Sequence, residues 1–230
     1  MESQVNSYRY ERKIHISELS RKEIESIVKL HPKSFKEIYY KRFVNNIYFD
    51  SIDFSSYYDN VDGNQHRVKY RIRWYGELFG HISNPVLELK IKNGLVGRKE
   101  SYQLASFEMD SSICIAYIRS ILNQSGLPDE ILIRMNILNP VLLNRYSRKY
   151  FISSDGLYRV TLDNGLEYYQ LKNNNNSFAN FVKEPEYSIL EIKYDNQNEA
   201  SANYIVTKFP FRLTKNSKYV NGVNHVYWVG

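Results

Sequence analysis

Short runs in which apolar and polar residues alternate recur from one end of the chain to the other. Successive side chains of a β-strand point to opposite faces, so such a run is typical of a strand with one buried face. Gly, Asn, Asp and Pro, which favour turns, separate many of the runs. The pattern predicts seven or eight strands, at 8–16, 44–49, 68–75, 86–92, 146–152, 158–162 and 188–194.

A few helices are expected between these strands. Ser20 and Glu23 form a capping box, in which each side chain accepts a hydrogen bond from the backbone N–H of the other residue. Apolar residues at helical spacing follow this box. Helices are therefore expected at 20–31, at 112–124, after Pro128, and at 199–208.

None of these helices is long enough to divide the chain. At 230 residues and 43% hydrophobic residues, the sequence is long and apolar enough to form one large β-rich unit. The four consecutive asparagines at 173–176 are typical of a solvated loop tip. We therefore expect a single domain over residues 1–230, of the mainly β (α+β) class with a few flanking helices.

The balance of charge and the cysteine content limit the classes of function that the chain can have. The 31 Lys and Arg residues outnumber the 25 Asp and Glu residues, which gives a net charge of +6 and favours an anionic partner. The single cysteine, Cys114, excludes an intrachain disulfide, and its apolar neighbours predict a packed thiol. The first ten residues are polar, and no run of about 18 apolar residues follows, so a cytoplasmic protein without a membrane segment is expected.

Cationic residues share one face of several predicted strands. Lys69, Arg71 and Arg73 alternate with apolar residues at 68–74, and Lys90 and Lys92 alternate in the same way with apolar neighbours. Such a face is either the solvated outside of a sheet or the polar lumen of a closed barrel, and periodicity alone leaves both open.

The types of charge favour phosphate chemistry. Arg offers planar, bidentate donors to phosphate oxygens, and Lys offers a compact point charge. The few carboxylates on the same faces, at Glu11, Glu88 and Glu191, are suited to a divalent cation that bridges phosphate oxygens. The sequence has no Walker P-loop, no G-x-G-x-x-G, no Cys/His cluster and no G-x-S-x-G elbow, which excludes the enzyme classes built on those motifs.

In their order and spacing, these strands resemble the catalytic domain of the vacuolar transporter chaperone (VTC) family. These proteins are polyphosphate polymerases within the triphosphate tunnel metalloenzyme superfamily. The resemblance covers nearly the whole chain. The segments that carry it are YERK (10–13), IYFD (47–50), VKYRIRWYG (68–76), ELK (88–90), YSR (146–148), YRVTLD (158–163), LEIK (190–193) and KNSKY (215–219).

The resemblance implies a closed antiparallel β-barrel of about eight strands with a cationic tunnel along its axis. It also implies transfer of the γ-phosphate of ATP to a growing polyphosphate or pyrophosphate acceptor, with a divalent metal, manganese or magnesium, held near Glu191. No nucleic acid is expected as a partner. The cations that match catalytic positions are Arg71, Arg73, Lys90, Arg148 and Arg159; the matching phosphate-binding residues are Lys13, Tyr146, Lys215, Ser217 and Lys218.

Two features depart from the family pattern. The first strand reads Arg9-x-Glu11-x-Lys13, whereas the wider superfamily favours Glu-x-Glu-x-Lys, which makes two-metal hydrolysis less favoured. After Lys90 the family places further lysines, and here Arg98 and Lys99 lie near that place without a clear match. A triphosphate or polyphosphate hydrolase on the same fold, and a non-catalytic protein that binds polyphosphate or nucleic acid, remain alternative functions.

Overall fold

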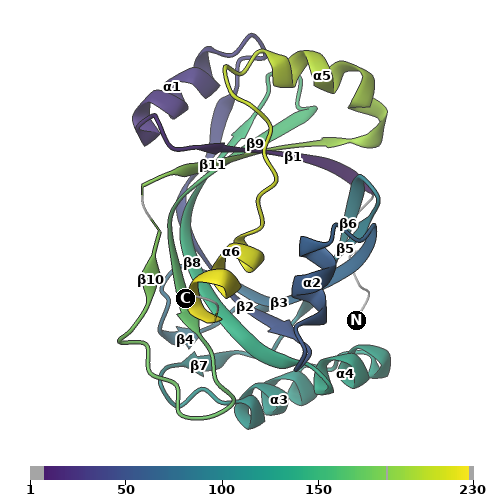
Figure 1. Cartoon of the computed structure of the whole chain (residues 1–230), viewed down its shortest axis with the longest axis vertical. Coiled ribbons are helices and arrows are strands. Elements are labelled where there is room, and N and C mark those ends of the chain that lie inside the picture. Colours follow the sequence, from purple (N-terminus) through teal and green to yellow (C-terminus); the bar gives the residue numbers. More distant parts are fainter. Residues whose placement is uncertain (1–7, 185, 228–230) are drawn as a thin grey trace.

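Strands dominate a computed structural model of the chain, which describes residues 8–184 and 186–227 (Figure 1). Most of the polar start of the sequence, residues 1–7, lies outside the described residues. The strands are β1 (Arg9–Ile16), β2 (Lys36–Asp50), β3 (His66–Tyr75), β4 (Gly80–Ile82), β5 (Val86–Asn93), β6 (Val96–Gln103), β7 (Phe107–Met109), β8 (Asn139–Ile152), β9 (Tyr158–Gln170), β10 (Val182–Lys183) and β11 (Ser188–Asp195). The helices are α1 (Arg21–Leu30), α2 (Ser55–Val61), α3 (Ile115–Gln124), α4 (Asp129–Asn136), α5 (Glu199–Thr207) and α6 (Lys218–Tyr227), with a 3₁₀ turn at Asn196–Asn198.

The main sheet is a closed antiparallel ring. Its strand order is β10-β9-β11-β1-β6-β5-β3-β2-β8, and a further pairing of β9 with β8 joins the ends, with β10 attached outside the ring at β9. Every neighbouring pair is antiparallel. The mainly β class and the closed barrel with flanking helices are therefore confirmed.

The ring is uneven where β1 meets β6. These two strands pair only at Arg9 with Gly97 and at Tyr10 with Val96. Further along β1, the segment before α6 takes the place of a neighbouring strand: Thr214 donates its N–H to the carbonyl of Lys13 at 2.8 Å, and His15 donates its N–H to the Thr214 hydroxyl at 2.9 Å. The C-terminal segment thus completes the wall at this point.

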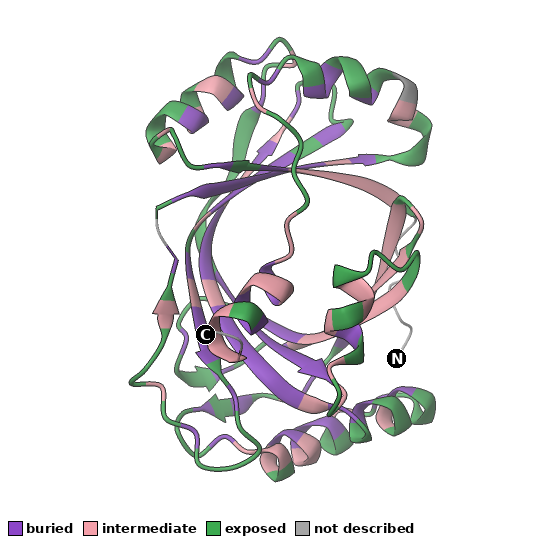
Figure 2. Ribbon diagram, in the orientation of Figure 1, coloured by how far each residue is buried: buried purple, intermediate pink, exposed green. Residues whose placement is uncertain are grey.

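Helices cover the outer surface of the ring on two sides (Figures 1 and 2). On one side α1 and α5 pack on β1, β11 and β9 around Ile14, Val160 and Ile192. On the other side α3 and α4 pack on β3 and β5 around Trp74 and Leu89. Because these outward faces are apolar and covered, the alternate residues of the same strands turn into the ring.

The last helix, α6, lies at one end of the ring, against β8 and β9 and beside α2 (Figure 1). Its buried residues Tyr219 and Val223 pack with Leu142 and Tyr168 of β8 and β9. A Cβ atom at Gly222 would lie 2.5 Å from Leu142 Cδ2 and 2.6 Å from Tyr168 Cδ1, so only glycine allows the helix this close. The sequence pattern did not predict this helix.

Several boundaries differ from the sequence predictions. The capping box at Ser20 and Glu23 is confirmed at α1. The helix expected from 112 begins only at Ile115, because Cys114 has an extended backbone and its sulfur accepts the N–H of Tyr117 at 3.5 Å. The predicted range 112–124 placed Cys114 inside the helix, whereas Cys114 is its half-buried N-cap. Among the helices of the described ranges, none is long and apolar enough to span a bilayer.

We expect Gly222→Ala to lower the free energy of unfolding by about 1–3 kcal/mol, the cost of overpacking a tight site, although alanine ordinarily favours a helix. Urea denaturation measures the change. Asn221→Ala, at the preceding position of α6, serves as the control and should stay within about 0.5 kcal/mol of wild type. A stabilised Gly222→Ala protein would contradict the close packing of α6.

Candidate functional site

The strand register gathers the charged faces inside the ring. Cross-strand partners share a face, and Arg71 lies opposite Glu88 while Lys69 lies opposite Lys90. Arg73 and Arg148, on opposite sides of β2, are only 8% and 6% exposed. The charged faces therefore point into the barrel. Of the two interpretations that the sequence left open, the polar lumen is the one that the structure has.

An arginine cluster occupies the wall formed by β2, β3 and β5. Arg71 contacts the Glu88 carboxylate through Nε at 2.9 Å and Nη2 at 2.7 Å, and Arg73 approaches the same carboxylate at 3.3 Å. Arg73 also donates to Asn46 Oδ1 at 2.9 Å. These contacts fix two guanidinium groups side by side, in positions that suit a phosphoryl group.

Lys99 belongs to this cluster, although the sequence gave it no clear match. Its ammonium lies 2.8 Å from Glu88 Oε1. Arg98, the neighbouring candidate, pairs instead with Glu100, on the other face of β6. Along β6, Gly97, Lys99 and Ser101 share one face, and this alternation could have placed Lys99 in the tunnel. It was not recognised as a strand pattern because both faces of β6 carry polar residues.

A second cluster joins the strand wall to α6. The Arg148 guanidinium makes two bonds to the Asp163 carboxylate, at 2.5 and 2.6 Å, and Lys218 approaches Asp163 at 2.7 Å. Both cations also contact Glu191, at 3.4 and 3.2 Å. Asp163 is fully buried. From the sequence it was included only as the last residue of the segment YRVTLD (158–163) and was not identified as part of the site.

Tyr146 lies between the two clusters. The Arg148 guanidinium and the Lys218 ammonium lie 5.3 and 4.9 Å from the centre of its ring, and its hydroxyl accepts a bond from Arg73 at 3.3 Å. Burial alone would raise the pKa of Tyr146, but the charges of Arg148 and Arg73 outweigh burial and lower it. The cations around the phenol therefore outweigh both burial and the nearby Asp163 carboxylate.

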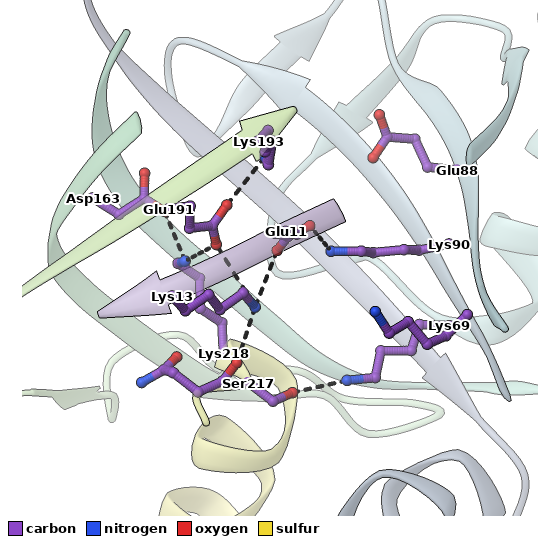
Figure 3. A network of polar contacts seen from close by, with 12 residues as sticks. Glu11, Lys13, Lys69, Glu88, Lys90, Asp163, Glu191, Lys193, Ser217 and Lys218 are labelled. Carbon is purple, nitrogen blue, oxygen red and sulfur yellow. Dashed lines mark hydrogen bonds and ion pairs between the residues drawn. The ribbon is translucent and has the colours of Figure 1, made fainter. Parts of the chain in front are cut away.

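A third group lies on β1, β5 and β11 (Figure 3). Glu11 lies 2.7 Å from Lys90 and 3.3 Å from Lys13, and Lys13 lies 3.8 Å from Glu191. Burial lowers the pKa of Lys90 to about 8, although the charge of Glu11 opposes this shift. Burial would raise the pKa of Glu191, but Lys218 and other nearby cations hold it well below its usual value.

Two lysines tie the start of α6 to the tunnel wall. Lys69 donates to the Ser217 hydroxyl at 2.8 Å, and Lys13 donates to the carbonyl of Asn216 at 2.9 Å. Ser217 also accepts the N–H of Val220 and so caps the helix. Burial lowers the pKa of Lys69 well below its usual value, as do, to a smaller degree, the nearby charges. Lys69 is another tunnel cation that was not among the predicted site residues.

Two predicted residues lie at the periphery. Arg159 is on the same face of β9 as Thr161 and Asp163, but it is exposed near the start of the strand. Lys215 is exposed in the segment before α6. Within the described ranges, neither forms an ion pair, so the structure does not join them to the buried clusters.

The carboxylates fit a metal only in combination with substrate oxygens. No group of three or more His, Cys, Asp or Glu residues in the described ranges has the geometry of a metal site. Glu11 and Glu191, however, both face the Lys13 ammonium, and Glu11 Oε1 accepts no hydrogen bond beyond its ion pair with Lys13 at 3.3 Å. Magnesium typically binds one or two carboxylates and completes its shell with phosphate oxygens and water. The residues present fit that arrangement.

A match to a known protein family agrees with this geometry. The family model of the VTC domain matches residues 7–227. A provisionally described adenylate cyclase of Vibrio parahaemolyticus has a similar fold, with a TM-score of 0.51 and 11% identity over 92% of this chain and 97% of that one. A protein of Pyrococcus horikoshii has a TM-score of 0.49 and 14% identity over 94% and 99% of the two chains. No curated protein matches the sequence.

Fold and site together define a tunnel protein of the class that binds triphosphate or polyphosphate: a closed antiparallel ring with a cationic lumen that extends over several strands. The chain belongs to the VTC domain family, whose model spans nearly its whole length.

We expect Asp163→Asn to lower the free energy of unfolding by about 3–5 kcal/mol, the cost of leaving buried cations without their partner. Asp195→Asn, which removes the exposed partner of Arg9, is the control and should cost less than about 1 kcal/mol. Chemical denaturation at neutral pH measures both. Equal effects of the two substitutions would show that the buried cluster does not stabilise the ring.

Proposed function

We propose that the protein is an ATP-dependent polyphosphate polymerase, which transfers the γ-phosphate of ATP to a polyphosphate or pyrophosphate acceptor inside the tunnel. The observation that carries the proposal is the extent of the cationic lumen. It continues from Arg71 and Arg73, past Arg148, to Lys218 and Lys13. One triphosphate needs only part of this surface, whereas a long polyanion can use all of it.

The residues have separate roles in this reaction. Arg71 and Arg73, held in parallel by Glu88, bind the transferred group, and Arg148 and Tyr146 continue the site along the tunnel. Phosphoryl transfer depends mainly on positioning and on neutralising charge, which fixed cations provide. The acceptor is itself a phosphate and needs little deprotonation, so no general base is required.

The chain-binding residues are assigned to the α6 side of the tunnel. Lys13, Lys90 and Lys218 lie there, and Ser217, just before α6, is assigned to the same group. Lys215 and Arg159 would act nearer the openings. Lysines on flexible stems suit a chain that must move by one phosphate after each transfer. Glu191, with Glu11 beside it, would hold manganese or magnesium, and that ion would neutralise phosphate oxygens.

With ATP and manganese, we expect the purified protein to form acid-labile polyphosphate and ADP, and a short polyphosphate primer to shorten any lag. Arg73→Ala should slow turnover at least tenfold, because a lost bond to a charged group costs roughly 1.5–3 kcal/mol. Gel electrophoresis of the phosphorus products provides the measurement. Release of orthophosphate alone would favour a hydrolase, and binding of polyphosphate without consumption of ATP would favour a non-catalytic binding protein.

We expect Glu191→Gln to lose stimulation by manganese, while its metal-free binding of tripolyphosphate is kept or tightened, because the substitution frees cations that now pair with Glu191. The matched control is Glu88→Gln, which also removes a buried carboxylate paired with cations. It should slow turnover without removing the response to manganese. An unchanged manganese response in Glu191→Gln would exclude Glu191 from the metal site.

A further inference from the structure

Three tyrosines and one arginine gather at the mouth of the ring opposite the end where α6 packs. Tyr150 is near the end of β8, Tyr39 near the start of β2, and Tyr75 at the end of β3. Leu142, which packs against α6, is near the opposite end of β8. Because neighbouring strands are antiparallel, the three tyrosines lie at one end of the ring, away from α6.

The register turns these residues toward the lumen. Tyr150 is two residues from Arg148, and Tyr75 is two residues from Arg73, so each shares a face with a buried tunnel arginine. Arg42 is the cross-strand partner of Arg148, and Tyr39 is the partner of Tyr150. The tyrosine mouth, defined as Tyr39, Arg42, Tyr75 and Tyr150, is therefore continuous with the phosphate-binding wall.

The rings are arranged around the guanidinium group. Arg42 lies 4.5 Å from the centre of the Tyr39 ring and 5.9 Å from the centres of Tyr75 and Tyr150. Tyr39 and Tyr150 meet edge to face at 5.6 Å. Unlike the deeper arginines, Arg42 pairs with no carboxylate in the described part of the chain. Tyr39 and Tyr75 are 50% and 51% exposed.

We infer that the tyrosine mouth binds the nucleobase of the nucleoside triphosphate by stacking. Aromatic rings and guanidinium planes both stack on bases, whereas a chain of phosphates has no flat face to offer them. A base placed here would leave its phosphates beside Arg73 and Arg148, two residues further along β3 and β8. Since every base has a π-face, little discrimination between adenine and guanine is expected.

This assignment rests on the proposed function, because it takes a nucleoside triphosphate as the substrate. The assignment also fixes the direction in which substrate and product pass through the tunnel. The nucleotide enters at the tyrosine mouth, the guanidinium groups of Arg71, Arg73 and Arg148 hold the transferred phosphate, and the growing chain extends toward the lysines beside α6.

The test compares two ligands that share phosphates but not a base. The dissociation constants of the β,γ-imido analogue of ATP and of inorganic tripolyphosphate are measured by calorimetry, without turnover. In the double variant Tyr39→Leu, Tyr75→Leu, the nucleotide should bind at least fivefold more weakly, while tripolyphosphate stays within twofold of wild type. The corresponding GTP analogue should weaken to the same degree.

Tyr40→Leu is the matched control, because Tyr40 is on the same strand, is 94% exposed and has no ring or cation partner among the described residues. It should change neither constant. Equal weakening of both ligands in the double variant, or no change in either, would overturn the nucleobase site and leave the polymerase proposal standing. If wild type binds tripolyphosphate but not the nucleotide, both proposals fail.

Discussion

The ion cluster around Asp163 is the interaction on which the rest of the tunnel depends. Its carboxylate joins Arg148 of β8 to Lys218 of α6, and so it fastens the last helix, at one end of the ring, to the strand wall. Removing a carboxylate from water is costly, and the cost is offset only when hydrogen bonds and opposite charges surround the group. These partners come from separate parts of the chain, so the buried charge is tolerated only in the closed ring.

The apolar side of the same strands explains why the charges are inside. Ile14 and Ile192 face α1 and α5, and Trp74 and Leu89 face α3 and α4. The hydrophobic effect thus acts mainly on the outer surface of the ring, where helices shield it from water. Because side chains alternate, covering these faces forces the charged positions into the lumen. The cationic tunnel is therefore a consequence of packing outside it.

The strongly alternating strands were predictable from the sequence, and so was the charged face that carries Arg71 and Arg73. Alternation could not show which face is inside, because an open sheet with a solvated charged face has the same pattern. Strand β6 was missed because Arg98 and Glu100 make its outer face polar as well. Helix α6 was missed because its stability comes from contacts such as Gly222 against Leu142, which no local pattern reveals. Asp163 needed the register that places it beside Arg148.

In the proposed reaction, the carboxylates of the tunnel have a role beyond stability. Glu88 pairs with Arg71, Arg73 and Lys99, while Glu191 is shared by Lys218 and three further cations. These anions hold the cations close together and in place, because like charges would otherwise repel one another at this distance. A phosphate that enters replaces a carboxylate as the anionic partner of these cations. The cations therefore do not have to be desolvated or reoriented again. Preorganisation of this kind makes fixed charges effective in phosphoryl transfer, because the site changes little as charge moves along the substrate.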